Sequence, residues 1–208
     1  MPMKLPNSEQ TSRPWRIHEL VRDFRLLDVW ALPTPGGPND FPRLVEIVAA
    51  GDTAETPSRA ARAVWAIRWR LGEILGWDEV EDSDLPEWQM LRDRLPDDLR
   101  GGPSGPEFES LPFQSVYLLE DEWAAELANK TVHGVLHLSW VPDGQGSYRG
   151  QMSVYVKPNG LLGSAYLAAI QPFRHLVVYP PMMRELERRW REEGRLGRPP
   201  LSRRPSPG

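Results

Sequence analysis

Cysteine is absent from the 208 residues of this chain. Its absence excludes a disulfide framework, a thiolate nucleophile and a cysteine zinc site. Disulfide-free chains are typical of reducing compartments, and the N-terminus, MPMKLPNSEQTSRPW, lacks the continuous apolar core of a signal peptide. We therefore expect a cytoplasmic protein.

Histidine is also scarce, with four in the chain. His133 and His137 are spaced like a ligand pair, but four residues of strand would separate them by roughly 13 Å, too far for one metal ion. The sequence accordingly predicts no metal site and no cofactor. It also lacks the P-loop, GxGxxG, GxSxG and HExxH patterns, so no catalytic residue can be assigned.

An excess of positive charge is missing as well. The formal net charge is −4, and the isoelectric point is near 5.6. Phosphate binding depends on clustered positive charge, so we expect no nucleic-acid partner.

No long apolar run is free of charge. The most apolar stretch, residues 160–183, carries Arg174 and His175 near its middle. A cation at the centre of a membrane helix costs about 2.5–3.5 kcal/mol on insertion scales. We interpret this stretch as helix that packs in the core, kinked or split at its prolines, and expect no membrane span.

The clearest pattern in the chain is a β-hairpin over residues 131–157. Apolar and polar residues alternate in both halves, and PDGQGS between them is turn chemistry. Both apolar faces coincide when Leu138 lies opposite Met152, and a shift by one residue would separate them. Gly134 and Gly150 leave part of the apolar face without side chains, which favours the close approach of a backbone or a ligand. We expect half-buried strands, with His133 and His137 on the solvent face or hydrogen-bonded.

Other elements follow from periodicity and capping residues. We expect strands over residues 24–33 and 113–119 and a helix from Asn39 or Asp40 through Ala50. We also expect a helix from residue 56 to about 75, a short helix near 88–94, and a short helix EWAAELAN capped by Asp121. In that last helix, the acidic cluster Glu120, Asp121, Glu122 and Glu126 would complement the helix dipole.

Domain organisation is simple. Residues 1–14 and 194–208 are polar and rich in Pro, Ser and Arg, so we expect disordered tails around a single domain over 15–193. With two hairpin strands, two further strands and a helical C-terminal stretch, the fold class is α+β: an antiparallel β-sheet packed against a C-terminal helix.

Several segments resemble a bacterial family known only as a domain of unknown function. They are DFRLLDVWALPTPGGPNDFPRLVEIV, LRDRLPDDL, EWAAELANKTVHGVLHLSWV, YRGQMSVYVKPNGLLGSAY and PFRHLVVYPPMM, and the resemblance spans about residues 15–190. That family is similar to START-like helix-grip proteins, the SRPBCC or pollen-allergen-like superfamily. The resemblance implies a curved antiparallel sheet that grips a long C-terminal helix, with an apolar cavity between them.

Three functions fit this reading. The leading hypothesis is binding of a small apolar molecule between the hairpin and the C-terminal helix. The residues expected to line such a cavity are Leu136, Leu138, Trp140, Met152, Val154, Tyr166 and Phe173. The alternatives are a cyclase- or hydratase-type enzyme that uses the same cavity and a protein-interaction module with exposed tryptophans such as Trp65 and Trp69. The sequence does not decide whether the protein is an enzyme, or its oligomeric state.

Overall fold

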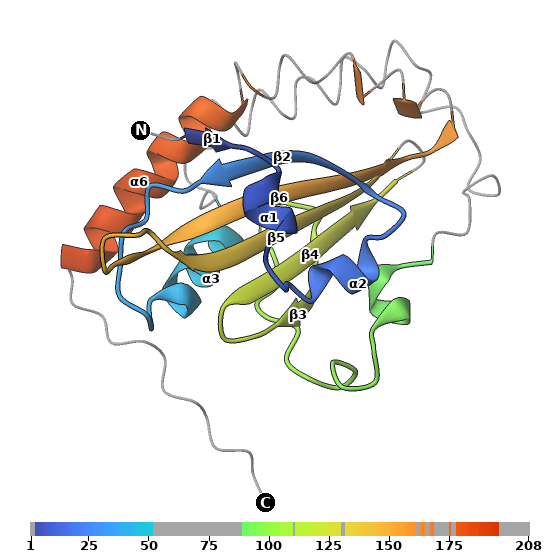
Figure 1. Cartoon of the computed structure of the whole chain (residues 1–208), viewed down its shortest axis with the longest axis horizontal. Helices are drawn as coiled ribbons and strands as arrows, with labels where there is room; N and C mark the ends of the chain where they lie inside the picture. Colours follow the sequence, from blue (N-terminus) through green and yellow to red (C-terminus); the bar gives the residue numbers. More distant parts are fainter. Residues whose placement is uncertain are drawn as a thin grey trace, which may run out of the picture.

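The computed structural model describes residues 3–51, 89–109, 111–129, 132–160, 163–164, 167–168, 175 and 178–195. These residues form a six-stranded antiparallel sheet in the order β1-β2-β6-β5-β4-β3 (Figure 1). The strands are β1 Met3–Leu5, β2 Arg25–Ala31, β3 Gln114–Leu118, β4 Glu122–Ala128, β5 Val132–Pro142 and β6 Tyr148–Pro158. The helices are α1 Ser8–Thr11, α2 Ile17–Leu20, α3 Phe41–Ala50, the short 3-10 helix η2 Leu91–Arg94 and α6 Tyr179–Arg195. The expected α+β class is confirmed.

The hairpin is confirmed residue by residue. Strands β5 and β6 pair antiparallel, with Leu138 opposite Met152 and Leu136 opposite Val154. In the connecting turn, the Asp143 carboxylate accepts hydrogen bonds from the backbone N–H groups of Gln145 and Ser147. Two turn glycines have positive φ, which other residues rarely adopt, so the chemistry of the turn sets the register.

The expected helix EWAAELAN is wrong, because these residues form β4. Ala, Glu and Leu favour helix, yet the segment also alternates, with Trp123, Ala125 and Leu127 on one face and glutamates on the other. Seven residue pairs with β5 fix it as a strand, and this tertiary pairing overrides the local helix propensity. Glu122 and Glu126 are therefore buried in the sheet rather than complementing a helix dipole.

The N-terminal segment also differs from the expected disordered tail. Strand β1 pairs with β2 at the edge of the sheet, and Gln10 of α1 is completely buried. At the other end, α6 continues to Arg195, and residues 196–208 lie outside the described ranges. With β1 and β4, the sheet has six strands, whereas the sequence predicted four.

The remaining elements largely follow expectation. Strands β2 and β3 and helix α3 occupy the expected ranges, and the short helix near residue 90 is η2. Asp40 stands at the N-cap of α3 without a side-chain capping bond, because its carboxylate accepts the backbone N–H of Gly37 instead. The helix expected over residues 56–75, with Trp65 and Trp69, lies outside the described residues.

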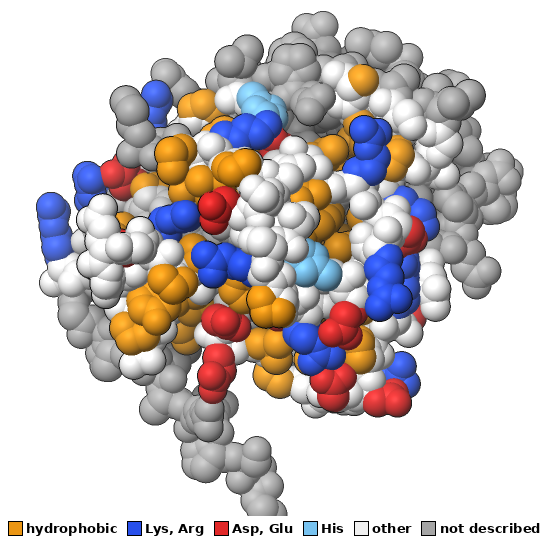
Figure 2. All heavy atoms as spheres, in the orientation of Figure 1, with side chains coloured by type: hydrophobic (Ala, Val, Ile, Leu, Met, Phe, Trp, Pro, Cys, Tyr) orange, Lys and Arg blue, Asp and Glu red, His pale blue; other side chains and the backbone are white. Residues whose placement is uncertain are grey.

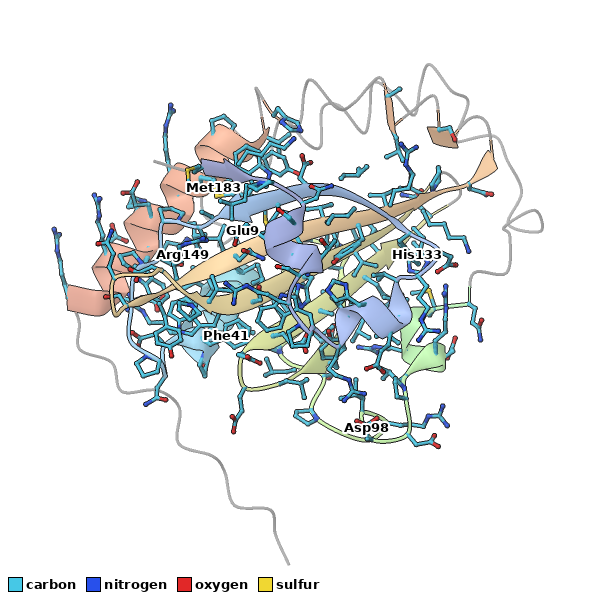
Figure 3. All side chains as sticks on the ribbon, in the orientation of Figure 1. Glu9, Phe41, Asp98, His133, Arg149 and Met183 are labelled. Atoms are coloured by element: carbon cyan, nitrogen blue, oxygen red, sulfur yellow. The ribbon has the colours of Figure 1, made fainter. Side chains whose placement is uncertain are left out.

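The sheet is covered on both faces. On the face that we call the inner face, α3 and α6 pack against each other and on the sheet, with Phe41 and Met183 in the core (Figure 3). On the opposite outer face lie α1, α2 and the segment around η2. Figure 1 shows α1 in front of the sheet. The expectation of half-buried strands is therefore wrong for β5, because His133 and His137 on the outer face are fully buried.

Among the described helices, none combines the length and the apolar character needed to cross a membrane.

Candidate functional site

The inner face of the sheet consists of cross-strand rows of side chains. One row places Trp30, Met152, Leu138 and Trp123 side by side on β2, β6, β5 and β4. The adjacent row towards α3 holds Gly150 and Trp140, and the adjacent row in the other direction holds Asp28, Val154, Leu136 and Ala125. Beyond it, Gly134 lies between Val156 of β6 and Leu127 of β4. On β4, β5 and β6 the tryptophans thus lie in the first two of these rows, and the next two rows carry no side chain larger than leucine.

Packing is tight at the large end of the inner face. A Cβ on Gly150 would lie 2.6 Å from Leu44 of α3, so a helix side chain fills the space that this glycine leaves. The Trp140 ring lies 5.8 Å from that of Trp190 on α6, and its indole N–H donates to the carbonyl of Gly37. The close approach expected at Gly150 is thus made by another part of the protein.

The other half of the inner face is less filled. Leu136 and Val154 lie at the middle of the two central strands and are only partly buried, whereas Leu138 and Met152 are 1% and 5% exposed. Among the described residues, a Cβ on Gly134 would meet only a backbone oxygen, at 3.8 Å. We call this region, made of Asp28, Ala125, Gly134, Leu136 and Val154, the stepped half of the inner face.

One carboxylate marks the edge of the stepped half. Asp28 of β2 is fully buried, and its Oδ1 lies 2.9 Å from Nζ of Lys4 on β1, with which it forms an ion pair, and 3.0 Å from Nε2 of His175. The Tyr179 hydroxyl at the start of α6 donates to its other oxygen at 3.2 Å. This carboxylate joins the N-terminal strand, the sheet and the C-terminal helix. The sequence did not predict this role, because the three partners are far apart in the chain.

The expected cavity residues fall into three groups. Leu138, Trp140 and Met152 belong to the packed half of the core, and Leu136 and Val154 belong to the stepped half. Tyr166 and Phe173 lie outside the described residues.

The outer face holds two buried carboxylate–histidine pairs. The first joins Glu126 of β4 to His133 of β5, with 2.8 Å between Oε2 and Nε2 and neither side chain exposed. The same carboxylate accepts the backbone N–H groups of Leu91 and Arg92, so it also anchors η2 to the sheet. Because three donors from two segments converge on this glutamate, the pair has a clear structural role.

The second pair joins Glu122 of β4 to His137 of β5, with 2.9 Å between Oε2 and Nε2. Glu122 also accepts the Tyr117 hydroxyl and the backbone N–H of Arg16, each at 2.9 Å. Burial raises the pKa of this carboxyl, but the hydrogen bonds from its partners, His137 first, outweigh burial and bring the pKa below its ordinary value. Burial lowers the pKa of His137, and the hydrogen bond to Glu122 only partly opposes it.

The directions of these two pKa shifts agree on the protonation state. A glutamate with a lowered pKa is ionised, and a histidine with a lowered pKa is neutral at pH 7. Neutral His137 must then donate its Nε2 proton to Glu122, which leaves Nδ1 as an acceptor. The acceptor nitrogen lies 3.1 Å from the amide nitrogen of Gln10.

Polar side chains surround His137 on the outer face. We call the group Gln10, Glu122, His137, Ser139, Gln151, Ser153 and Tyr155 the outer polar cluster. All are buried, and the hydroxyl oxygens of Ser139 and Ser153 and Oε1 of Gln151 have no hydrogen-bond partner among the described residues. The sequence carries one signal of this cluster, the polar alternation of His137, Ser139, Gln151 and Ser153. That pattern is also typical of a solvent-exposed face, so it did not predict the cluster.

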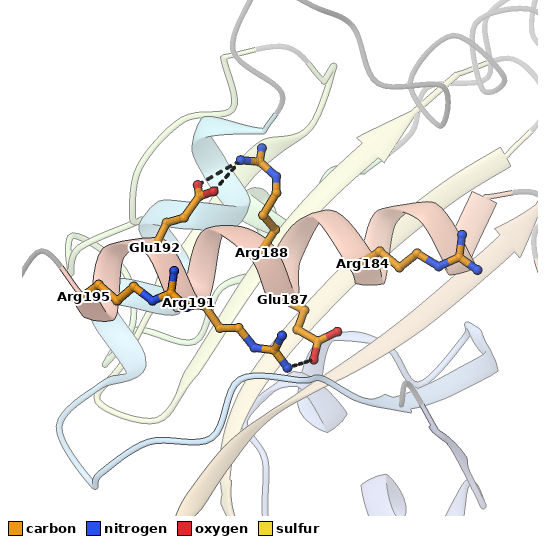
Figure 4. Close-up of a pocket in the computed structure, with 6 residues that line it drawn as sticks. All are labelled: Arg184, Glu187, Arg188, Arg191, Glu192 and Arg195. Carbon is orange, nitrogen blue, oxygen red and sulfur yellow. Dashed lines mark hydrogen bonds and ion pairs between the residues drawn. The ribbon is translucent and has the colours of Figure 1, made fainter.

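A depression on the protein surface runs along α6 (Figure 4) and is lined by Arg184, Glu187, Arg188, Arg191, Glu192 and Arg195. Arg188 pairs with Glu192, and Arg191 with Glu187, at a spacing of four residues. Such pairs on an exposed helix contribute only about 0.3–0.5 kcal/mol each. We interpret this as a solvated helix face. Figure 2 likewise shows charges of both signs interspersed over the face that it presents.

Two further features bear on function. Within the described ranges, no three His, Asp or Glu side chains come together as they would around a metal ion. The five tryptophans that the structure describes, Trp15, Trp30, Trp123, Trp140 and Trp190, are all buried, so none of them forms an exposed patch.

Comparison with protein families finds a match to a family described as a protein of unknown function (DUF2867), whose model matches residues 20–181. No curated protein and no solved structure matches the chain.

Proposed function

The chain belongs to the DUF2867 family, and from its geometry we propose that this domain binds a small, mostly apolar molecule between the sheet and the C-terminal helix, over the stepped half of the inner face. The partial burial of Leu136 and Val154 carries the proposal. These two residues face each other at the centre of the sheet, where a filled core would bury both.

The difference in side-chain size between the two halves supports this placement. The packed half is filled by tryptophans of the sheet and by helix side chains, whereas the stepped half offers Ala125 and Gly134. Ligand sites are typically apolar clefts with a few polar groups that fix orientation. Here Asp28, with Lys4 and Tyr179, provides such a polar group at one edge.

The family resemblance points in the same direction. Helix-grip proteins hold apolar ligands between a curved sheet and a C-terminal helix. In this chain α6 follows β6 and lies on the inner face, with Tyr179 and Met183 in the same core as the sheet. Fold-level analogy alone is a weak argument for function, so the proposal depends mainly on the side chains.

A pair of tryptophan substitutions tests the proposal. Leu136→Trp places an indole in the stepped half, so we expect the melting temperature to change little and the binding of N-phenyl-1-naphthylamine, a neutral apolar probe, to fall at least tenfold. Leu138→Trp overfills the packed half and should cost about 1–3 kcal/mol. For a chain of this size that lowers the melting temperature by about 2–4 °C per kcal/mol.

Leu136→Met serves as the matched control, because it keeps the volume and should retain probe binding. Native mass spectrometry of the freshly purified wild-type protein would detect a retained small molecule. The proposal fails if the wild-type protein binds no probe and retains no molecule. It also fails if Leu136→Trp destabilises the protein as much as Leu138→Trp does.

A further inference from the structure

Residues 6–14 cross the outer face above the outer polar cluster, and we call them the cover. Their helix α1, where Figure 3 labels Glu9, lies over the middle of the sheet. Gln10 is the only buried side chain in the cover, and no apolar side chain anchors it between Leu5 and Trp15. An isolated helix of four residues is unstable in water. Segments with so few buried apolar contacts open locally at low free-energy cost.

The Gln10 side chain is held as a ligand would be. Its amide nitrogen lies 3.1 Å from Nδ1 of His137 and donates to the Tyr155 hydroxyl at 3.0 Å. Its amide oxygen accepts Nε2 of Gln151 at 2.9 Å. Both ends of one carboxamide are therefore recognised by side chains of β5 and β6.

The sheet beneath Gln10 has more hydrogen-bonding capacity than Gln10 uses. The register sets His137 opposite Ser153 and Ser139 opposite Gln151, so the four side chains form a block. Ser139 Oγ, Ser153 Oγ and Gln151 Oε1 are fully buried and lack a partner among the described residues. Buried polar atoms are nearly always hydrogen-bonded, so three such atoms in one block indicate a site for a polar molecule.

We propose that this block is a second binding site, specific for a small neutral molecule with a primary carboxamide, and that Gln10 occupies it until the cover opens. The ligand N–H group would donate to His137 and Tyr155, its carbonyl would accept from Gln151, and the serine hydroxyls would bind further polar atoms. A carboxylate ligand would lack the N–H donor for His137 and would be repelled by the Glu122 carboxylate, 2.9 Å from the same ring. This site is independent of the one proposed on the inner face.

Chemical rescue tests the recognition. Gln10→Ala removes side-chain atoms that correspond to one acetamide molecule, so acetamide can fill the space they leave. Added acetamide should therefore raise the melting temperature of this variant by several degrees more than that of the wild-type protein. Sodium acetate has nearly the same shape but should give no such rise. Thr11→Ala, an exposed neighbour in α1, is the matched control and should respond to acetamide like the wild-type protein. Equal effects of acetamide and acetate on Gln10→Ala, or no effect of either, would overturn the proposal.

Hydrogen exchange tests the opening of the cover and needs no variant, so it remains decisive if Gln10→Ala does not fold. The backbone N–H groups of Thr11 and Ser12 bond to the carbonyls of Asn7 and Ser8 in α1. We expect them to exchange at least 100-fold faster than those at the centre of β5, at a rate insensitive to low urea. If the backbone N–H groups of Thr11 and Ser12 exchanged only when the whole protein unfolds, the cover would be a permanent part of the core. That result would overturn the proposal.

Discussion

His137 uses both ring nitrogens, one for the Glu122 carboxylate and one for the Gln10 amide, in a setting with no solvent exposure. In the unfolded chain the same imidazole is hydrated and accepts a proton near pH 6.5, about the usual value. In the folded chain, burial lowers its pKa. Below about pH 6.5 the unfolded state therefore binds more protons than the folded state.

From this difference we predict that the free energy of unfolding decreases as the pH falls from 7 to 5, because stability rises with pH wherever the unfolded state binds more protons. Glu122 acts in the same direction at lower pH: its folded pKa is lowered, so its contribution is lost as the pH falls below about 4.3. Urea denaturation of the wild-type protein at several pH values measures the effect.

His137→Gln is the control, since it retains a hydrogen-bonding side chain that does not titrate. Its stability should vary less between pH 7 and 5 than that of the wild-type protein. Identical pH profiles for the two proteins would contradict the assignment to His137.

Strands β5 and β6 contribute one glycine each to the inner face, and the two have different surroundings. A Cβ on Gly150 would lie 2.6 Å from Leu44, 2.9 Å from Leu32 and 2.9 Å from Thr34. With the described residues, a Cβ on Gly134 would make one ordinary contact, 3.8 Å from the carbonyl oxygen of Leu127. Gly150 is thus closed in by α3 and by the loop between β2 and α3, whereas no described side chain lies against Gly134.

We predict that Gly150→Ala destabilises the protein by about 1–3 kcal/mol, because the added methyl group forces neighbouring side chains to move. Gly134→Ala should be neutral or stabilising by up to about 1 kcal/mol, because alanine reduces the conformational entropy of the unfolded chain. Urea denaturation of both variants gives the comparison. Equal losses of stability would mean that the two halves of the inner face are packed alike.

At the scale of the whole molecule, the N-terminal segment connects the two faces of the sheet. Lys4 of β1 reaches Asp28 beside the inner-face core, while Gln10 enters the outer polar cluster. A disordered tail could be removed without cost. A docked segment adds to the free energy of unfolding. Each factor of ten by which the docked state is favoured over the undocked state adds about 1.4 kcal/mol.

We therefore predict that a protein beginning at Trp15 folds but is less stable than the full chain by about 1–3 kcal/mol. Leu5 accounts for part of this loss, since it is 8% exposed in the folded chain. Differential scanning calorimetry of the two proteins would measure it, and Gln10→Ala in the full chain separates the contribution of the buried amide. An unchanged melting temperature on truncation would restore the interpretation as a disordered tail.

Elements whose side-chain pattern allows one physical solution could be predicted from the residues alone. Alternation predicted the register of β5 and β6 to within an even shift, because a shift by one residue would bring apolar and polar faces together. Capping residues and periodicity placed α3, and the expected order of strands and helices gave the α+β class.

Tertiary contacts determine which polar residues are exposed to solvent and which are buried with a partner. Ala, Glu and Leu in β4 favour helix locally, and pairing with β5 was needed to make them a strand. The same pairing brings Glu122 to His137 and Glu126 to His133, so residues that indicate a solvent face by pattern are buried as partners. Gln10 joins them from 127 residues away. A polar residue is stable in a core only when its partner is present, and for this cluster the partners meet only in the folded chain.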